Sequence, residues 1–334
     1  MRCSVVILNW NGAAMLRRYL PSVVEHTASM PDVEIVVADN GSTDESLQLL
    51  AAEFPCVRTI VLDKNYGFAE GYNKAIALID SEYTVLLNSD VEVTNGWLSP
   101  ILAYMDAHPE VAAAQPKIHS WLHKDYFEHA GAAGGYLDML GYPFCRGRVL
   151  SKVEQDKGQY DSVAEVLWTS GACMCIRTCI YKESGGLDSE FFAHMEEIDL
   201  CWRLCCRGYQ LVCLPDSTVY HLGGGALGYE NPRKTYLNFR NNLLMIYKNM
   251  PAKRLWWVLL LRFVLDYAAT LQFLLTGKPK QARAVLTARK DYHKMKPHFA
   301  TKRKDNISKT TIPHPVGIRH CSVFWLALKH IIAI

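Results

Sequence analysis

Short apolar segments alternate with helix-length segments through residues 3–120, and this alternation restricts the fold more than any other feature of the sequence. The apolar runs CSVVILN, VEIVVADN, VRTIVLD and YTVLLNSD each have the length of a β-strand. Strands that are separated by helices pair in parallel, and helices then cover both faces of the sheet. The sequence therefore predicts an α/β protein with a doubly wound sheet.

Polar side chains stand at or just beyond the end of each apolar run. Ligands of open parallel sheets bind beyond the carboxyl ends of the strands, so these side chains should face one crevice. They are Asn9, Asn11, Asp39, Asn40, Asp63, Asn65, Asn88 and Asp90.

The nucleotide-binding motifs of dehydrogenases and ATPases do not follow the first run, since neither GxGxxG nor GxxxxGK[ST] occurs there. After the second run, GSTDE is typical of a helix start with Ser42 or Thr43 as N-cap. Asp39, just before it, can accept hydrogen bonds from the N–H edge of a pyrimidine base, or it can cap a loop.

The segment LLNSDVEV contains side chains that could bind a divalent cation. In extended chain Asn88, Asp90 and Glu92 share one side. Mg²⁺ and Mn²⁺ prefer oxygen ligands, and one or two carboxylates with phosphates and water are enough to hold them. The ion would then bridge Asp90 to a diphosphate, although a solvent-exposed turn has the same pattern.

Seven ordered motifs resemble a known family: VVILNWNG, VVADNGSTDES, KNYGFAEGYN, LLNSDVEV, SGACMCIR, GGLDSEFFAHMEEIDLCWRL and YHLGG. Together they are similar to the family 2 glycosyltransferases, particularly their bacterial rhamnosyltransferase-like branch. The resemblance covers residues 3–250. It implies the GT-A fold, a Rossmann-like mixed sheet flanked by helices, with a nucleotide-sugar-binding half (1–117) and an acceptor-binding half (118–250). Residues 251–334 are then a helical, basic and apolar extension.

The resemblance also implies roles for motif residues. The position of Asp39 contacts the donor base, and the DxD motif for metal and diphosphate falls on Asn88, Ser89 and Asp90, with Asn in place of the first Asp. His221 would complete a Mn²⁺ or Mg²⁺ site with Asp90 and Asn88, and the glycines after it would let the backbone approach the diphosphate. The donor is expected to be a UDP- or dTDP-linked sugar. Further residues expected at the donor site are Asn9, Asn65, Gly67, Asn73 and Arg240.

Glu196, Glu197 and Asp199 are three carboxylates in four positions. The resemblance places the catalytic base at Glu197. Asp199 and Arg203 are spaced i, i+4, which suits an ion pair on a helix. Acids at a helix start are also stabilised by the helix dipole, so a structural role is the alternative for all three.

The acceptor side is expected in the second half of the chain. The resemblance places Trp168, Ser170 and Gly171 there. The glycine-rich segment 128–148 predicts a mobile loop over the sugar site, with an ordinary surface excursion as the alternative. Asp138, Tyr142 and Arg146 are candidate contacts in that segment.

Taken together, the residues predict an inverting, metal-dependent glycosyltransferase, a hexosyl- or deoxyhexosyltransferase of EC class 2.4. A carboxylate would deprotonate a hydroxyl of a saccharide or lipid-linked saccharide, and a cation would stabilise the leaving diphosphate. Such a reaction belongs to cell-surface polysaccharide synthesis. A sugar nucleotidyltransferase and a catalytically silent nucleotide-sugar or glycan-binding protein are the alternatives.

Charge and hydropathy suggest where the protein works. The segment 277–309 contains 11 Lys or Arg and two Asp. The apolar segments beside it are interrupted by Arg262, Asp266 and Lys329, so we expect no membrane-spanning helix. They either lie on the inner-membrane surface or pack on the body. The N-terminus lacks a secretory signal and the 11 cysteines indicate reduced thiols, which favours a cytoplasmic protein, free or peripheral on the cytoplasmic face of the membrane. We expect no nucleic-acid partner.

Overall fold

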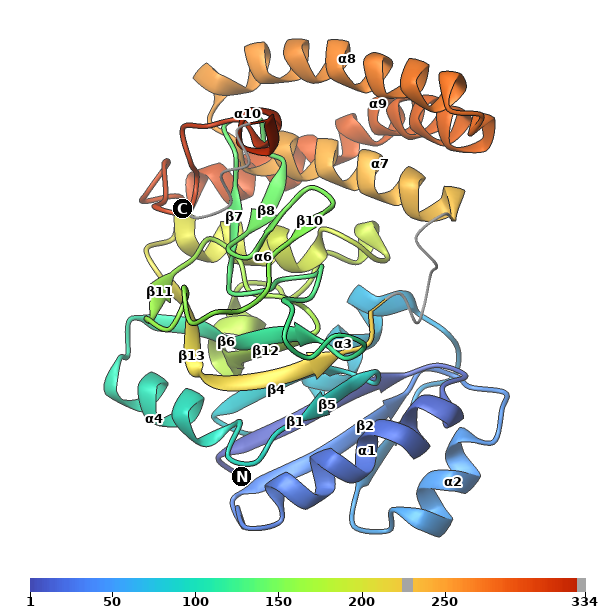
Figure 1. The fold of residues 1–334 in the computed structure, drawn as a ribbon, viewed down its shortest axis with the longest axis vertical. Coiled ribbons are helices and arrows are strands. Elements are labelled where there is room, and N and C mark those ends of the chain that lie inside the picture. Colours follow the sequence, from blue (N-terminus) through green and yellow to red (C-terminus); the bar gives the residue numbers. More distant parts are fainter. Residues whose placement is uncertain (224–230, 329–334) are drawn as a thin grey trace.

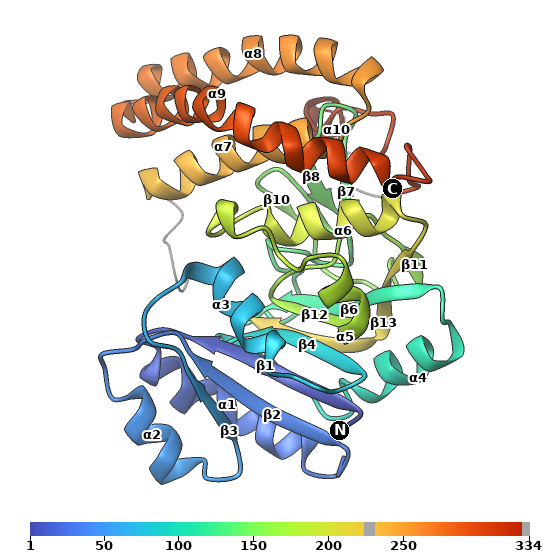
Figure 2. The same cartoon turned by 180° about the vertical axis from the view of Figure 1, so that it is seen from behind.

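The computed structural model describes residues 1–223 and 231–328. Figure 1 shows a sheet-containing body beneath a layer that is formed by α7, α8 and α9, and Figure 2 shows the same two parts from behind.

The first half of the body is the predicted parallel sheet. Its strands lie in the order β4-β1-β2-β3, and all of these neighbours are parallel. The strands are β1 (Cys3–Asn9), β2 (Val33–Asp39), β3 (Arg58–Val61) and β4 (Tyr83–Asn88). The helices that connect them are α1 (Ala13–Thr27), α2 (Ser46–Glu53) and α3 (Gly67–Ala77). Because the strands are parallel, their carboxyl ends meet at one edge, where Asn9 is in register with Asp39.

Both faces of the central strands β1 and β4 are buried, which explains why these strands are apolar on both faces, whereas the edge strand β3 is largely exposed. Val5 and Ile7 of β1 belong to one hydrophobic cluster, whereas Val6 between them belongs to the other.

The second half makes the sheet mixed. β12 is antiparallel to β4 and to β6, whereas β13 is parallel to β6. The strands added are β5 (Val91–Val93), β6 (Val111–Ser120), β11 (Ala164–Glu165), β12 (Cys173–Arg177) and β13 (Gln210–His221). β5 pairs with the end of β13, where His221 is in register with Val91. This pairing places His221 beside the segment that follows β4.

The glycine-rich segment is not a mobile loop, so that prediction is wrong. It forms a small antiparallel sheet of β7 (Gly135–Leu137), β8 (Pro143–Cys145), β9 (Arg148–Val149) and β10 (Lys152–Val153). Asp138 is buried and accepts hydrogen bonds from the backbone N–H groups of Leu140 and Tyr142, which closes the β7–β8 turn. Tyr142 is half-buried and lies under the guanidinium of Arg262, and the contacts of Asp138 and Tyr142 with a sugar stay predictions.

The remaining helices are α4 (Ser99–Ala107), α5 (Thr178–Glu183), the short 3₁₀ helix η1 (Ser189–Phe191), α6 (Glu196–Cys206), α7 (Pro232–Asn249), α8 (Ala252–Leu275), α9 (Pro279–Ser308) and α10 (Val323–Leu328). α9 packs along α7 and along α8. The predicted domain boundary at residue 250 falls between α7 and α8, and α7 joins the body to the helical layer above it (Figure 1).

Candidate active site

A cluster of polar side chains lies where β4 ends and β13 ends. Oδ1 of Asp90 is 3.1 Å from Nε2 of His221, and the amide of Asn88 is 3.4 Å from the same nitrogen. On the other side of the imidazole, Oε2 of Glu128 is 3.4 Å from Nδ1. Asp90, Glu128 and His221 are all buried. The predicted metal residues are therefore brought together, with Glu128 as an additional carboxylate.

The charged forms of His221, Asp90 and Glu128 stabilise one another. Burial opposes a charge on His221, but its hydrogen bonds to Asp90 and Glu128 outweigh this and raise its pKa to about 10. Burial also opposes the charges of the two carboxylates, yet the imidazolium holds the pKa of Asp90 and that of Glu128 below their ordinary values. The cluster is therefore two carboxylates that share one cationic imidazole.

The donor set fits a hard or borderline divalent cation. Neighbouring ligands of an octahedral ion with bonds of about 2.1 Å lie about 3 Å apart, close to the Asp90–His221 separation of 3.1 Å. Within residues 1–223 and 231–328, no group of three or more His, Cys, Asp or Glu side chains lies close enough together to hold a metal ion, so the candidate set is Asp90, His221 and the amide oxygen of Asn88. Imidazole ligates a metal only in its neutral form, so a bound cation would take the place of the proton that His221 carries in the cluster. Gly224 and Gly225, the later glycines expected at the diphosphate, lie outside the described residues.

Glu196 and Glu197 begin α6 and differ in environment. Burial raises the pKa of Glu197 to about 7, whereas burial and the charge of Glu197 raise the pKa of Glu196 well above its ordinary value. Glu197 is half-buried, and within the described part of the chain its Oε2 has no hydrogen-bond partner. Glu197 is therefore a carboxylate with a pKa near neutral and one buried oxygen that has no partner in the described part of the chain.

Glu197 and Asp90 belong to the same edge of the sheet. A Cβ placed on Gly171 would lie 3.8 Å from Cβ of Glu197, so Glu197 packs against the segment before β12. The next residue in that segment, Ala172, accepts a hydrogen bond of 3.0 Å from the backbone N–H of Asn88. Gly171 thus connects the carboxylate of Glu197 to the end of β4, and the role of this segment on the acceptor side stays a prediction.

The loop that leads into α6 is strained. Phe192, His194 and Met195 have φ angles of 64°, 69° and 75°, which are unfavourable for residues with a side chain. Asn241 of α7 is fully buried, and its amide nitrogen donates to three carbonyls of this loop. The acceptors are Phe191 (2.9 Å), Ala193 (2.9 Å) and His194 (2.8 Å). Asn241 therefore stabilises the strained entry to the helix that carries Glu197.

Arg240 supports the same loop. Its guanidinium donates to the backbone carbonyls of Glu190 and Phe191 at 3.2 and 3.3 Å, and it lies over the ring of Tyr236. The predicted contact between Arg240 and a donor phosphate stays a prediction.

Asp199 has the structural role that its spacing suggested. It is fully buried and pairs with Arg203 at 3.0 Å and with Lys248 at 2.8 Å. Asn249 donates to its other oxygen at 2.8 Å. Asp199 therefore joins α6 to α7, and it is not a second base.

Asn9 and Asp39 lie at the carboxyl edge of the parallel strands, as predicted, and their side chains are hydrogen-bonded to each other. Asn9 donates to Asp39 at 3.1 Å, and the backbone N–H of Ser42 donates to the other carboxylate oxygen at 2.9 Å. Asp39 is fully buried, so its contact with a nucleotide base stays a prediction.

The N-cap prediction for Ser42 or Thr43 is wrong, because α2 begins at Ser46. The hydroxyl of Ser42 instead accepts a hydrogen bond from the backbone N–H of Asn11.

Asn65 and Gly67 connect the donor edge to the base. Oδ1 of Asn65 accepts from the backbone N–H of Gly67 at 2.8 Å, and Gly67 has a φ of +78°. A Cβ at Gly67 would lie 2.6 Å from the ring of Phe192. The carbonyl of Phe192 in turn accepts from the backbone N–H of Phe68 at 2.9 Å, in the first turn of α3. The strained loop thus contacts the motif KNYGFAEGYN directly.

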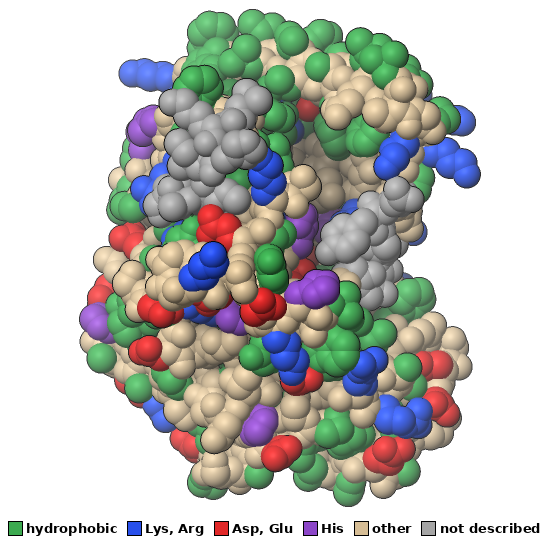
Figure 3. Space-filling view, viewed as in Figure 1, with side chains coloured by type: hydrophobic (Ala, Val, Ile, Leu, Met, Phe, Trp, Pro, Cys, Tyr) green, Lys and Arg blue, Asp and Glu red, His purple; other side chains and the backbone are tan. Residues whose placement is uncertain are grey.

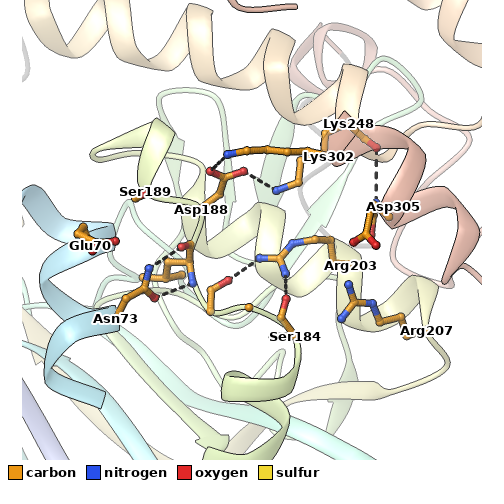
Figure 4. A pocket seen from close by; sticks show the side chains of 14 residues that line it. Glu70, Asn73, Ser184, Asp188, Ser189, Arg203, Arg207, Lys248, Lys302 and Asp305 are labelled. Carbon is orange, nitrogen blue, oxygen red and sulfur yellow. Dashed lines mark hydrogen bonds and ion pairs between the residues drawn. The ribbon is translucent and has the colours of Figure 1, made fainter. Parts of the chain in front are cut away.

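Asn73 lies in a separate polar cavity of about 370 Å³ that neither Asp90 nor Glu197 lines. Figure 4 shows its amide facing the 184–189 loop, where it binds the backbone N–H and C=O of Leu187. Asp188, in the same cavity, is paired with Lys248 and Lys302 at 2.7 and 2.6 Å. The prediction that Asn73 lines the donor site is therefore not supported by its position.

Sequence reasoning missed Glu128, and it named Asn241 only together with Arg240, as a candidate phosphate contact rather than as a support of the loop before α6. Glu128 is the acid at the start of the glycine-rich segment, and Asn241 belongs to the run RNN in α7. Neither stands at a spacing that relates it to His221 or to Glu197, so only the fold brings them there.

The comparisons with known proteins agree with the fold. Residues 4–153 match the family model described as Glycosyl transferase family 2. The N-acetylglucosaminyl-diphospho-decaprenol L-rhamnosyltransferase of Mycobacterium tuberculosis is 27% identical over 235 residues, or 65% of this chain and 75% of that protein. S. aureus TarS 1–349 in complex with UDP has a TM-score of 0.59 at 17% identity, covering 92% of this chain and 89% of its own. GalNAc-T7 with UDP, GalNAc and Mn²⁺ has a TM-score of 0.59 at 18% identity, covering 75% and 48%.

The mixed sheet and its flanking helices are the GT-A fold, so the predicted fold class is confirmed, and the protein is a glycosyltransferase enzyme. More narrowly, residues 4–153 match the family 2 glycosyltransferase model, and the chain is similar to bacterial rhamnosyltransferases.

Proposed function

We propose that the protein is an inverting, metal-assisted glycosyltransferase. It transfers a hexosyl or deoxyhexosyl group from a UDP- or dTDP-linked sugar to a hydroxyl of a saccharide or lipid-linked saccharide. The observation that supports this best is the position of Glu197, with a pKa raised to about 7, against the segment that pairs with Asn88 beside Asp90 and His221.

In the proposed reaction Glu197 accepts the proton of the acceptor hydroxyl as that oxygen attacks the anomeric carbon. One base and one leaving group on opposite sides of the sugar give a single displacement, with inversion. Asp90, His221 and Asn88 would hold a Mn²⁺ or Mg²⁺ ion, which supplies charge stabilisation to the leaving diphosphate when it is bound. Asn241 and Arg240 keep the loop before α6 in place.

The acceptor and the location are proposed from two observations. A relative at 27% identity is named for an acceptor that is linked to decaprenol through a diphosphate. The segment 277–309 is strongly basic and follows the apolar helix α8. We therefore assign the enzyme to the cytoplasmic face of the inner membrane, as a peripheral protein in polysaccharide synthesis.

A donor screen tests the proposed function. The full chain is incubated with Mn²⁺ and a panel of UDP- and dTDP-linked sugars, first without and then with a polyprenyl-diphosphate-linked saccharide. Release of nucleoside diphosphate that Glu197→Gln abolishes, with an inverted anomeric configuration in the NMR spectrum of the product, supports the proposal. Pyrophosphate release, or binding of a donor without turnover in the presence of acceptor, contradicts it.

A further inference from the structure

Helix α8 has its charged residues on the inside. Its buried positions are Val258, Arg262, Asp266 and Thr270, which recur every four residues and form one stripe toward the body. Arg262 donates to the backbone carbonyl of Leu140 and to the amide oxygen of Asn242, and Asp266 pairs with Arg289 of α9. The polar face of this helix is therefore the one that packs on the protein.

The opposite face of α8 is apolar and exposed. Val264 lies about 200° around the helix from Asp266, at 100° per residue. The same side carries large side chains at helical spacing, and Trp256, Leu260 and Leu271 are 68%, 59% and 56% exposed. We call this set the outer stripe: Trp256, Leu260, Phe263, Val264, Tyr267 and Leu271. A soluble surface helix has the reverse arrangement.

Length alone would let α8 cross a bilayer. It has 24 residues, about 36 Å, and an 18-residue window within it has a mean hydropathy of 1.7. Arg262 and Asp266 lie near its middle, however, and a spanning helix would separate both of them from their partners in the body and in α9. The contacts instead favour a helix that lies along a surface.

Cations flank the outer stripe. Lys253 is exposed at the start of α8, and Lys280 is exposed just beyond its end. Figure 3 shows apolar side chains gathered over α8 at the top of the molecule, with Lys and Arg side chains at both ends of this layer. Phe324 and Trp325 of α10 are also exposed, and the ring of Phe324 packs on Tyr142, which lies against Arg262 of α8.

We propose that the outer stripe of α8 docks on a bilayer that contains anionic lipids, with the helix parallel to the membrane plane. The apolar side chains enter the interface between headgroups and acyl chains, and the flanking cations contact the headgroups. The charge favours lipid over a second copy of the chain, because two copies would bring the same basic flanks together. The proposal extends the proposed function, since a docked enzyme meets a lipid-linked acceptor at the surface, but docking itself requires no sugar.

Sedimentation of the full chain with lipid vesicles tests whether the outer stripe docks on a membrane. Vesicles of phosphatidylcholine alone are compared with vesicles that also contain phosphatidylglycerol, at low and at high salt. We expect binding to the anionic vesicles that weakens as salt rises, and at least about a tenfold loss of affinity in the double variant Leu260→Glu, Leu271→Glu. The matched control is Leu78→Glu, since Leu78 is 57% exposed in the sheet-containing body. It should bind as the wild type does.

Several outcomes would overturn the docking proposal: no binding at low salt, equal binding of the double variant, or retention in the membrane after alkaline carbonate washing, which indicates a spanning helix. Dissociation of a wild-type dimer by the same two changes, without vesicle binding, would instead assign the stripe to a second copy. Donor hydrolysis is measured without vesicles. A double variant that hydrolyses donor normally separates failure of docking from failure of the proposed enzyme activity.

Discussion

Replacing Glu197 by Gln tests the assignment of the catalytic base. The pKa of Glu197 is raised to about 7, so about one tenth of the carboxyl groups are ionised at pH 6 and about nine tenths at pH 8. A general base works in its ionised form, so the wild-type rate should rise about tenfold between these pH values. Gln cannot accept the proton, and general-base catalysis contributes about 10²- to 10⁴-fold. The variant should lose turnover by this factor, without the pH dependence near 7.

Glu196→Gln is the matched control. Burial and the neighbouring charge raise the pKa of Glu196 well above its ordinary value, which favours the neutral carboxyl form that Gln imitates. It should keep turnover within a few fold. The assay follows initial rates of nucleoside-diphosphate release with acceptor present from pH 5.5 to 8.5, and donor affinity is measured separately by calorimetry. A flat wild-type profile, or equal losses in the two variants, would refute the assignment.

Three further changes test other parts of the site. Asp90→Ala removes one of the proposed ligands, so Mn²⁺ binding followed by electron paramagnetic resonance should weaken by at least about tenfold, and unchanged binding would exclude the ligand role. Asn241→Asp places a carboxylate among three carbonyls, so we expect at least about a tenfold loss of turnover with little change in donor affinity. Asn306→Asp, a buried amide of α9 that does not touch the loop, is its control and should keep turnover. Asp199→Asn leaves Arg203 and Lys248 with one carboxylate charge fewer, which should lower the free energy of unfolding by about 3–5 kcal/mol in urea denaturation; a loss below about 1 kcal/mol would contradict the structural role.

The sequence alone predicted those features that depend on interactions between residues close together in the chain. The four apolar runs predicted parallel strands because a strand that is buried on both faces must be apolar at every position, as Val5, Val6 and Ile7 of β1 are. The pairing of Asp199 with Arg203 followed from helical spacing, since one turn brings residues i and i+4 together.

Tertiary structure decided what depends on segments far apart in the chain. Glu128 reaches His221 only because β6 and β13 are neighbours, and Asn241 reaches the loop before Glu197 only because α7 crosses above it. Ser42 has a side chain suited to an N-cap, but the backbone of Asn11 competes for it. The composition of α8 showed that the helix is apolar, whereas its packing on α9 decided that the charges face inward and the outer stripe faces out. The spacing of residues in the sequence shows which side chains share one face of a helix or strand. Which of its faces is buried depends on the neighbouring elements, and these are known only from the tertiary structure.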